Sequence, residues 1–397
     1  RSALGCFTEA RRFSARASGT CIRSGDSLRI WNRPRAFFLS AHRKSAPGWR
    51  TAARKHGKQY IFFRCGRLHN RAVYTYSLLW WAERLCGKMY YIGIDLGGTN
   101  IAAGIVREDG KIVVQSSVPT LSQRPTDEIV KDMVFLSKQL IKDAELELND
   151  IEAVGIGCPG TINFETGEVI YSNNIKMEHY MLAKEFQKYL NLPVKIDNDA
   201  NCAAMGEYIV SGNNVPIFMF ITLGTGVGSG LILNGKVFRG FNGAASEAGH
   251  ITLVSGGEPC TCGKRGCWET YASVTALIRQ TKVAMEKNPE SLMHEIAKAE
   301  GKISGRTSFD AAKQGDKAAQ AVVKQYAQYV ADGIVSVENV LQPDIISVGG
   351  GISREGEYLL QPVCEYAAAN GFNKFMPKTK IVTAQSFNDA GIIGAAS

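Results

Sequence analysis

The chain has 397 residues, of which 45% are hydrophobic and 21% charged, and its formal net charge is +9. This length gives room for two or more domains with cores of their own, and this composition excludes wholesale disorder. The sequence holds no run of about 18 apolar residues, so we expect no transmembrane helix.

The net charge is the average of two different segments. Residues 1–88 hold 19 basic and three acidic side chains, a net charge of +16, whereas residues 89–397 have a net charge of −7. Four of the five Trp lie in the first segment, and all nine Met lie in the second, beginning with Met89. The basic character of the whole chain therefore belongs to its first segment.

Residues 1–88 allow three interpretations. A nucleic-acid-binding arm would use its Arg side chains to neutralise phosphates. A transit peptide would be rich in Arg and Ser and poor in acidic residues. The third interpretation, which we favour, is an upstream region read through in frame, because the segment shows no sustained helical or alternating period and Met89 is a natural start. We therefore expect a basic extension that is disordered or not native coding.

From Met89 onward, predicted strands and helices alternate. Strands are expected at 90–95, 101–106, 111–118, 151–157 and 194–197. A helix capped by Thr126 or Asp127 carries apolar residues at helical spacing, a second helix lies near 178–190, and a third begins near Ala200. This alternation is typical of an α/β fold.

The second half of this region begins as the first half does. A strand at 217–223 leads into a glycine-rich turn, and Asn234-Gly235 between two apolar runs predicts a β-hairpin. The remaining elements are an irregular stretch at 250–271, helices over 272–342, a strand at 345–348 and a last helix from about 388. Each half thus starts with a strand, a glycine turn and a hairpin, which indicates a loose duplication.

Three glycine-rich turns follow predicted strands. They are Asp95 to Asn100 with Gly97, Gly98 and Thr99; Gly224 to Gly228 with Thr225 and Gly226; and Gly349, Gly350 and Gly351. Glycines let the backbone approach a phosphate and direct N–H groups at it, and Asp95 can hold Mg²⁺ through water. The alternative is a set of tight turns that need positive φ. The second turn is neither a Rossmann fingerprint, because a hairpin follows it, nor a Walker loop, because it has no Gly-Lys-Ser/Thr. The first two turns suit a phosphate chain held between two domains, and the third suits an adenine or ribose.

Four potential metal ligands lie close together in sequence. They are His250, Cys260, Cys262 and Cys267. One His and three Cys make a complete tetrahedral Zn²⁺ set, and a site with four protein ligands is structural rather than catalytic. The alternatives are disulfides or buried free thiols, and disulfides are disfavoured because the chain shows no secretory signal.

Carboxylates lie at two further places in the sequence. Asp197, Asn198 and Asp199 stand where a strand meets a helix, and a carboxylate there can accept a proton from a hydroxyl group, although Asx residues also cap helices at such junctions. Glu247 and Glu269 flank the Cys/His cluster. Carboxylates and imidazole suit the hydroxyl groups of a sugar, and the alternative for each Glu is solvent exposure or a salt bridge.

Together these motifs resemble those of the ROK family (repressor, open reading frame, kinase) of sugar kinases, within the actin-like ATPase superfamily. The resemblance covers essentially all of residues 89–397. It rests on the turn from Asp95 to Thr99, Cys158-Pro159-Gly160, Asn198-Asp199-Ala200-Asn201, the turn from Gly224 to Gly228, Glu247-Ala248-Gly249-His250, and the Cys cluster with Glu269.

The resemblance implies a role for each motif. It implies Asp199 as the general base, His250 with the three Cys on a structural Zn²⁺, and ATP with Mg²⁺ at the three glycine turns. The implied sugar-binding residues are Gly160, Asn198, Asp199, Glu247, His250 and Glu269. It also implies a fold of two actin-like (ribonuclease H-like) domains with a cleft between them. The expected domains are 89–205 with a returning helix at 388–397, and 206–387 with a zinc loop at 250–267.

The implied activity is ATP-dependent phosphorylation of a hexose at its 6-hydroxyl, with glucose as the expected hexose. Glucose, N-acetylglucosamine, N-acetylmannosamine and fructose remain open as substrates. A sugar-sensing transcriptional regulator and a zinc-dependent hydrolase are the competing classes. We expect a cytoplasmic enzyme of glycolysis that forms a homodimer or homotetramer, with no membrane and no nucleic-acid partner.

Overall fold

The computed structural model describes residues 30–32, 35–37, 39–40, 49–55, 58–63 and 89–397, except Asn173. The chain divides into two units, 1–88 and 89–397. The strands described in the first unit are β1 (Ile30–Asn32), β2 (Arg35–Phe37), β3 (Leu39–Ser40), β4 (Trp49–Lys55) and β5 (Lys58–Phe63). They pair as β1–β2 and in the order β3-β5-β4. Most of the basic segment, and with it most of our prediction for residues 1–88, lies outside the described residues.

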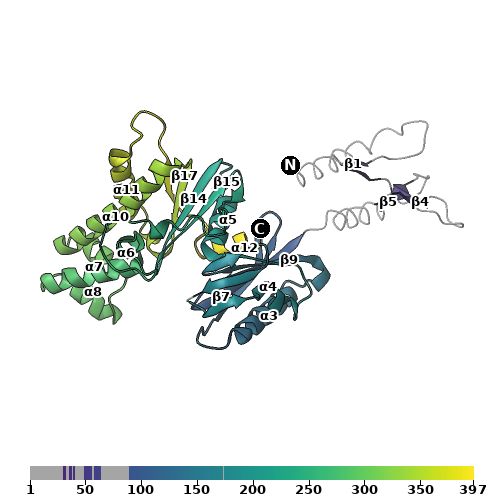
Figure 1. The fold of residues 1–397 in the computed structure, drawn as a ribbon, viewed down its shortest axis with the longest axis horizontal. Helices are drawn as coiled ribbons and strands as arrows, with labels where there is room; N and C mark the ends of the chain where they lie inside the picture. Colours follow the sequence, from purple (N-terminus) through teal and green to yellow (C-terminus); the bar gives the residue numbers. More distant parts are fainter. Residues whose placement is uncertain are drawn as a thin grey trace, which may run out of the picture. The chain divides into compact units, whose positions relative to one another are not determined.

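The second unit begins with a five-stranded sheet in the order β13-β9-β6-β7-β8. Its strands are β6 (Tyr90–Leu96), β7 (Asn100–Arg107), β8 (Ile112–Pro119), β9 (Ile151–Cys158) and β13 (Val194–Asn198). The first three form an antiparallel meander, and β9 and β13 run parallel to β6. Helices α3 (Thr126–Asp143) and α4 (Leu182–Gln187) cover one face of this sheet (Figure 1). A small antiparallel sheet of β10 (Thr161–Asn163), β11 (Glu168–Ser172) and β12 (Met177–Tyr180) follows β9.

A second five-stranded sheet, in the order β16-β15-β14-β17-β18, repeats this topology. Its strands are β14 (Ile217–Leu223), β15 (Val227–Leu233), β16 (Lys236–Val237), β17 (Ile345–Gly349) and β18 (Lys380–Thr383). Again the first three strands form an antiparallel meander, and the last two run parallel to the first. The duplication that the sequence indicates is therefore confirmed, and so is the hairpin at Asn234-Gly235, where both residues have positive φ.

Strand β14 is buried on both faces, which explains its unbroken apolar sequence. Phe218 and Phe220 pack on one side against α5 (Asp199–Ser211), while Met219, Ile221 and Leu223 pack on the other side against a helical layer. That layer consists of α6 (Glu269–Ala272), α7 (Val274–Lys287), α8 (Met293–Glu300), α9 (Thr307–Lys313), α10 (Lys317–Leu341) and α11 (Glu357–Asn370). Because side chains alternate across a strand, one apolar run serves two cores.

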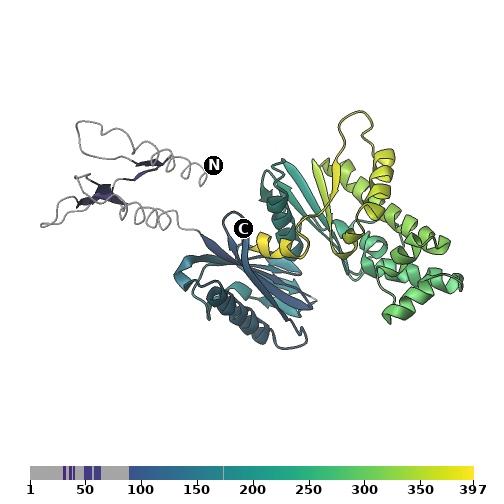
Figure 2. The ribbon, with the colours of Figure 1, turned by 180° about the vertical axis from the view of Figure 1, so that it is seen from behind.

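The two sheets are joined through α5 and the last helix, α12 (Ala390–Ala395), which lie side by side between them (Figure 2). Their contact is made by backbone rather than by long side chains. A Cβ on Gly206 would lie 2.0 Å from the carbonyl oxygen of Ala390, and one on Gly394 would lie 1.6 Å from that of Cys202. Only glycine permits this approach, so the spacing of the two helices is fixed.

The structure differs from the sequence predictions at several places, and strands β10 and β11 were not expected. Residues 177–180 form β12 rather than the start of a helix, and α4 begins only at Leu182. The residue at the N-cap of α3 is Pro125, and neither Thr126 nor Asp127 caps it. Helix α11 and strand β18 were not expected from the sequence. The short 3₁₀ helices are η1 (Leu148–Asp150), η2 (Ala248–His250), η3 (Gly351–Glu355) and η4 (Phe387–Asp389).

Within the described residues, none of the helices combines the length and the hydropathy that crossing a membrane requires. The boundaries between the two expected actin-like domains stay a prediction.

A variant that begins at Met89 should fold with an unchanged melting temperature. The reason is that every strand of both five-stranded sheets, and every helix from α3 to α12, lies after this residue. Thermal unfolding followed by circular dichroism measures the effect. A control variant that begins at Asp95 loses most of β6 and should not fold. A large fall in melting temperature for the Met89 variant would show that residues 1–88 stabilise the rest of the chain.

Candidate functional site

The carboxyl ends of β6, β9 and β13 bring two acidic residues together. These strands are parallel neighbours, with Asp95 opposite Gly157 and Asn198 opposite Cys158. Asp199 follows at the first position of α5. Burial, and then the nearby Asp199 carboxylate, raise the pKa of Asp95 to about 6. Two carboxylates that repel one another at a strand edge form a site that favours a cation or a transferable proton.

The structure gives the three neighbouring Asx residues different tasks. Asn198 is the N-cap of α5, and its Oδ1 accepts the N–H groups of Ala200 at 2.9 Å and Asn201 at 3.2 Å. Asp197 accepts from Arg239, with Nε 2.8 Å and Nη2 2.6 Å from its Oδ2. Both residues therefore maintain the strand–helix junction.

Asp199 differs from its two neighbours. Its Oδ1 accepts the N–H of Ala200 at 2.9 Å, and no Lys or Arg of the described part of the chain forms an ion pair with it. Burial raises the pKa of Asp199, while the hydrogen bonds to Ala200 and Asn198 act in the opposite direction. A carboxylate that is desolvated, oriented and without a cationic partner is a suitable general base.

Gly160 lies close to this junction. The Nδ2 of Asn198 donates to its carbonyl oxygen at 3.2 Å. Its φ is +113°, and a Cβ there would lie 2.1 Å from the carbonyl oxygen of Tyr171. The turn after β9 therefore requires glycine on two grounds, and it presents backbone groups beside the acidic pair.

The first glycine turn joins β6 to β7. Gly97 N–H donates to the carbonyl oxygen of Asn100 at 3.0 Å, which closes the turn over Gly98 and Thr99. The hydroxyl of Thr120 donates to the carbonyl oxygen of Gly97 at 2.6 Å. The turn is thus fixed at the end of the strand that carries the Asp95 carboxylate.

The second and third glycine turns meet at one edge of the second sheet. Strands β14 and β17 are parallel, and Thr222 lies opposite Gly349, so the turns that follow them are neighbours. A Cβ on Gly350 would lie 2.3 Å from the carbonyl oxygen of Leu223. The second turn also lies against α5, because a Cβ on Gly228 would be 3.3 Å from the Cβ of Ala200. Of the predicted nucleotide-binding residues, Gly224, Thr225 and Gly226 form the turn between β14 and β15, Gly228 is the second residue of β15, and Gly351 begins η3.

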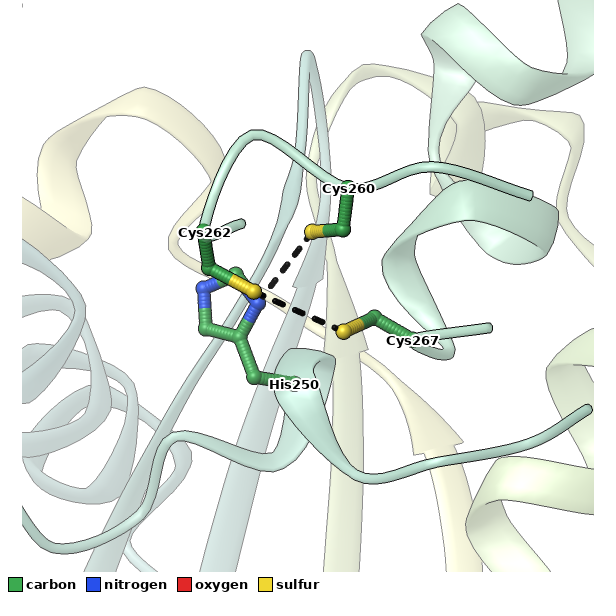
Figure 3. Close-up of side chains that lie close together, drawn as sticks. All are labelled: His250, Cys260, Cys262 and Cys267. Atoms are coloured by element: carbon green, nitrogen blue, oxygen red, sulfur yellow. Dashed lines mark hydrogen bonds between the residues drawn. The ribbon is translucent and has the colours of Figure 1, made fainter. Parts of the chain in front are cut away.

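The four predicted metal ligands converge (Figure 3). The ligand atoms of His250, Cys260, Cys262 and Cys267 all lie within 4.8 Å of one another. His250 Nδ1 is 3.6 Å from Cys260 Sγ, and the sulfur atoms of Cys262 and Cys267 are also 3.6 Å apart. Zn–S bonds of about 2.3 Å place the ligand atoms of a tetrahedron about 3.8 Å apart. The donor set therefore fits zinc in both chemistry and spacing.

Two carboxylates flank this cluster. Glu247 precedes η2, and burial raises the pKa of its carboxyl while His250 lowers it. Glu269 begins α6, with Oε2 accepting the N–H of Val227 at 3.0 Å and Oε1 lying 3.7 Å from Cys260 Sγ. Asp199 raises the pKa of Glu247, as does Glu269, so these acidic groups share one neighbourhood. The site thus joins the acidic pair to the cluster.

Sequence reasoning missed several residues that organise the site. Arg239 pairs with Asp197 across 42 positions of sequence. Gly391 lies against the Asp95 carboxylate, where a Cβ would be 2.5 Å from Oδ2. Thr275 donates from Oγ1 to the carbonyl oxygen of Thr225 at 2.7 Å. None of the three stands in a recognisable local motif, so no sequence signal pointed to them.

Comparison with known proteins gives consistent results. A model of the ROK family matches residues 91–397. The chain is 34% identical over 307 residues to a glucokinase of Halalkalibacterium halodurans, covering 77% of this chain and 93% of that protein. It is 35% identical over 315 residues to a glucokinase of Thermotoga maritima, covering 78% and 97%. Among solved structures, a ROK family glucokinase from Streptomyces griseus in complex with glucose and AMPPNP matches with a TM-score of 0.68 and 35% identity, covering 77% of this chain and 98% of that one.

The Cys262→Ala variant should lose bound zinc. We expect one equivalent of zinc per wild-type chain. The variant should retain little of it, because one ligand of four is removed. Elemental analysis of the purified proteins measures this. The control is Cys364→Ala, which removes a free thiol of α11. Equal zinc in both variants would show that the cluster does not bind the metal through Cys262.

Proposed function

Since the chain belongs to the ROK family, we propose that it is an ATP-dependent sugar kinase that phosphorylates the 6-hydroxyl of a hexose, preferably glucose. One observation carries the proposal. The buried, oriented Asp199 carboxylate lies within electrostatic reach of both Asp95 and Glu247. Similarity to glucokinases at 34% and 35% identity supports sugar phosphorylation.

Asp199 acts as the general base in this proposal. Its raised pKa makes the carboxylate a better proton acceptor than an exposed Asp, and the Ala200 N–H holds one oxygen in place. The 6-hydroxyl of the sugar gives its proton to Asp199 as its oxygen attacks the γ-phosphorus in line. Asp197 and Asn198 hold the junction, so the base keeps its orientation during the step.

The sugar-binding side of the site is assigned to the residues around the Cys/His cluster. Glu247 and Glu269 can accept hydrogen bonds from ring hydroxyls. His250 turns Nδ1 toward the sulfur of Cys260, which leaves Nε2 for a hydroxyl group. Gly160 contributes backbone groups from the turn that Asn198 holds. Zinc bound by His250 and the three Cys would keep this loop rigid.

The nucleotide is assigned to the glycine turns. The turns at Gly97–Asn100 and Gly224–Gly228 offer N–H groups to the phosphates, and Gly349 to Gly351 leave room for the adenine or ribose. Asp95 would hold Mg²⁺, and a divalent cation fits because Asp95 is a buried carboxyl whose pKa is raised by burial and by the neighbouring Asp199 carboxylate. Mg²⁺ bound with ATP supplies charge stabilisation on the transferred phosphoryl group.

Two other functions compete with this proposal. A sugar-sensing regulator of the same family would bind the sugar without transferring phosphate to it. A zinc-dependent hydrolase needs an open coordination position, and a site with four protein ligands has none. The regulator is therefore the alternative that the assay must exclude.

The test of the function is ADP release over a panel of glucose, N-acetylglucosamine, N-acetylmannosamine and fructose with ATP and Mg²⁺. We expect turnover with glucose at the highest kcat/KM, and product phosphorylated at the 6-position. Higher kcat/KM with another sugar would correct the substrate. Sugar binding without ADP release for every member would favour the regulator.

Asp199→Asn should lower kcat by roughly 10²-fold or more, because an amide keeps the shape of the carboxylate but cannot take the proton. The Kd for glucose, measured by calorimetry, should change little. The control is Asp310→Asn on α9, where the carboxylate forms an ion pair with the exposed Arg306. Retention of more than about a tenth of the wild-type rate by Asp199→Asn would exclude it as the general base.

A further inference from the structure

One short segment holds the second glycine turn from the side of the Cys/His cluster. We call residues 269–275 the clamp. Val227 N–H donates to Glu269 Oε2 at 3.0 Å, Val274 N–H donates to the carbonyl oxygen of Gly224 at 2.8 Å, and the Thr275 hydroxyl donates to that of Thr225 at 2.7 Å. Three hydrogen bonds between this one segment and the turn thus fix the path of the turn.

The fit between clamp and turn is tight. A Cβ on Gly226 would lie 2.1 Å from Glu269 Oε2, so the carboxylate occupies the space that any other residue would need. Gly224 N–H donates inside the turn to the carbonyl oxygen of Gly226 at 3.0 Å. Among the described residues, the N–H groups of Thr225 and Gly226 have no acceptor. They are the donors that remain for a phosphate.

The clamp is rigidly mounted. It follows directly on Cys267 and Trp268, and the Trp268 indole is fully buried, with Nε1 donating to the carbonyl oxygen of Tyr329 at 2.8 Å. The Tyr326 hydroxyl donates to the carbonyl oxygen of Ala272 at 2.8 Å. Both tyrosines belong to α10, so the backbone of the clamp is anchored at two points to a 25-residue helix, and the Glu269 side chain is the part that can reorient.

We propose that the clamp couples sugar binding to nucleotide binding, with Glu269 as the shared group and Thr275 as a positioning residue. The inference rests on the proposed function. Glu269 has two oxygens, and Oε2 already accepts the N–H of Val227. Oε1 lies 3.7 Å from Cys260 Sγ, and a zinc-bound thiolate has no proton to donate to it, so Oε1 can accept from a sugar hydroxyl. A sugar hydroxyl that bonds to Oε1 orients the whole carboxylate and thereby fixes Val227, the residue after the two free donors. Occupation of the sugar site therefore prepares the turn for phosphate, and the reverse effect must be equal.

Because of this coupling, loss of zinc should affect nucleotide binding as well as sugar binding. Cys260 Sγ lies 3.7 Å from Glu269 Oε1, so loss of zinc changes the surroundings of the carboxylate that holds the phosphate turn as well as the sugar side. The clamp thus joins two sites that lie about 40 residues apart in sequence, as the Val227–Glu269 separation of 42 shows.

Calorimetry on the full chain tests the coupling, with glucose and the non-hydrolysable ATP analogue AMPPNP with Mg²⁺ as probes. For the wild type, saturating glucose should lower the Kd for AMPPNP by roughly 5-fold or more. Thr275→Val removes one clamp bond and keeps the shape. It should weaken AMPPNP binding by roughly 2- to 10-fold and leave unchanged the Kd for glucose measured without nucleotide. The ratio of the AMPPNP Kd without glucose to the AMPPNP Kd with saturating glucose should move toward one.

Two variants serve as controls. Thr275→Ser keeps the hydroxyl and should restore the wild-type ratio. Thr281→Val alters the same helix at a fully buried hydroxyl that has no hydrogen-bond partner among the described residues, so it should match the wild type in every measurement. A merely structural role for Thr275 would lower the melting temperature without moving the ratio.

The outcomes separate this inference from the proposed function. The coupling would be overturned, and the kinase proposal would stand, if glucose left the Kd for AMPPNP of the wild type unchanged. The same holds if Thr275→Val showed the same effect of glucose on AMPPNP binding as the wild type. Failure of the wild type to bind AMPPNP with glucose present would overturn the proposed function, and the coupling with it.

Discussion

The close approach of α12 to its neighbours is the contact on which the rest of the structure depends. A Cβ on Gly93 would lie 1.9 Å from the carbonyl oxygen of Ile392, and one on Gly155 would lie 1.7 Å from that of Ala395. Together with the glycine contacts to α5, these set the last helix directly between the first sheet and the helix that begins at Asp199. The separation of Asp95 and Asp199 is therefore determined by backbone packing, which tolerates no added methyl group.

Within the junction that this backbone packing fixes, the residues of the site have different roles. Side chains that maintain geometry are fully bonded, as Asp197 is with Arg239 and Asn198 is with the start of α5. Asp199 keeps a raised pKa because its burial outweighs the hydrogen bonds that lower it. The carboxylates of Asp95 and Glu247 have raised pKa values for the same principal reason. Acidic groups that destabilise one another are retained where chemistry needs them.

Much of the fold could be predicted from local patterns, since β14, the Asn234-Gly235 hairpin and α5 all follow from short-range periodicity and turn chemistry. The exceptions depend on distant partners. Residues 177–180 form a strand because Met177 pairs with Ser172 and Tyr180 with Val169, which no helical period reveals. Helix α11 contains Pro362, which argues locally against a helix, yet packing of Leu359, Leu360 and Val363 in the core maintains it.

For the site, the spacing of Cys260, Cys262 and Cys267 was enough to predict a cluster with His250, because Cys and His are recognisable as zinc ligands from the sequence alone. The roles of the neighbouring Asx residues could not be predicted in this way, because the partner of Asp197 is Arg239, which lies 42 positions away in sequence. The clamp was equally hidden, because Glu269 and Thr275 reach the glycine turn only in the folded chain.

A crystal structure of the protein with glucose, AMPPNP and Mg²⁺ tests the proposed roles most directly. We expect the 6-hydroxyl oxygen of glucose to lie within hydrogen-bond distance of a carboxylate oxygen of Asp199 and in line with the γ-phosphorus. Glu247, His250 and Glu269 should contact other hydroxyls of the same ring. A complex in which Asp199 faces solvent, or in which another hydroxyl is aligned with the γ-phosphorus, would contradict it.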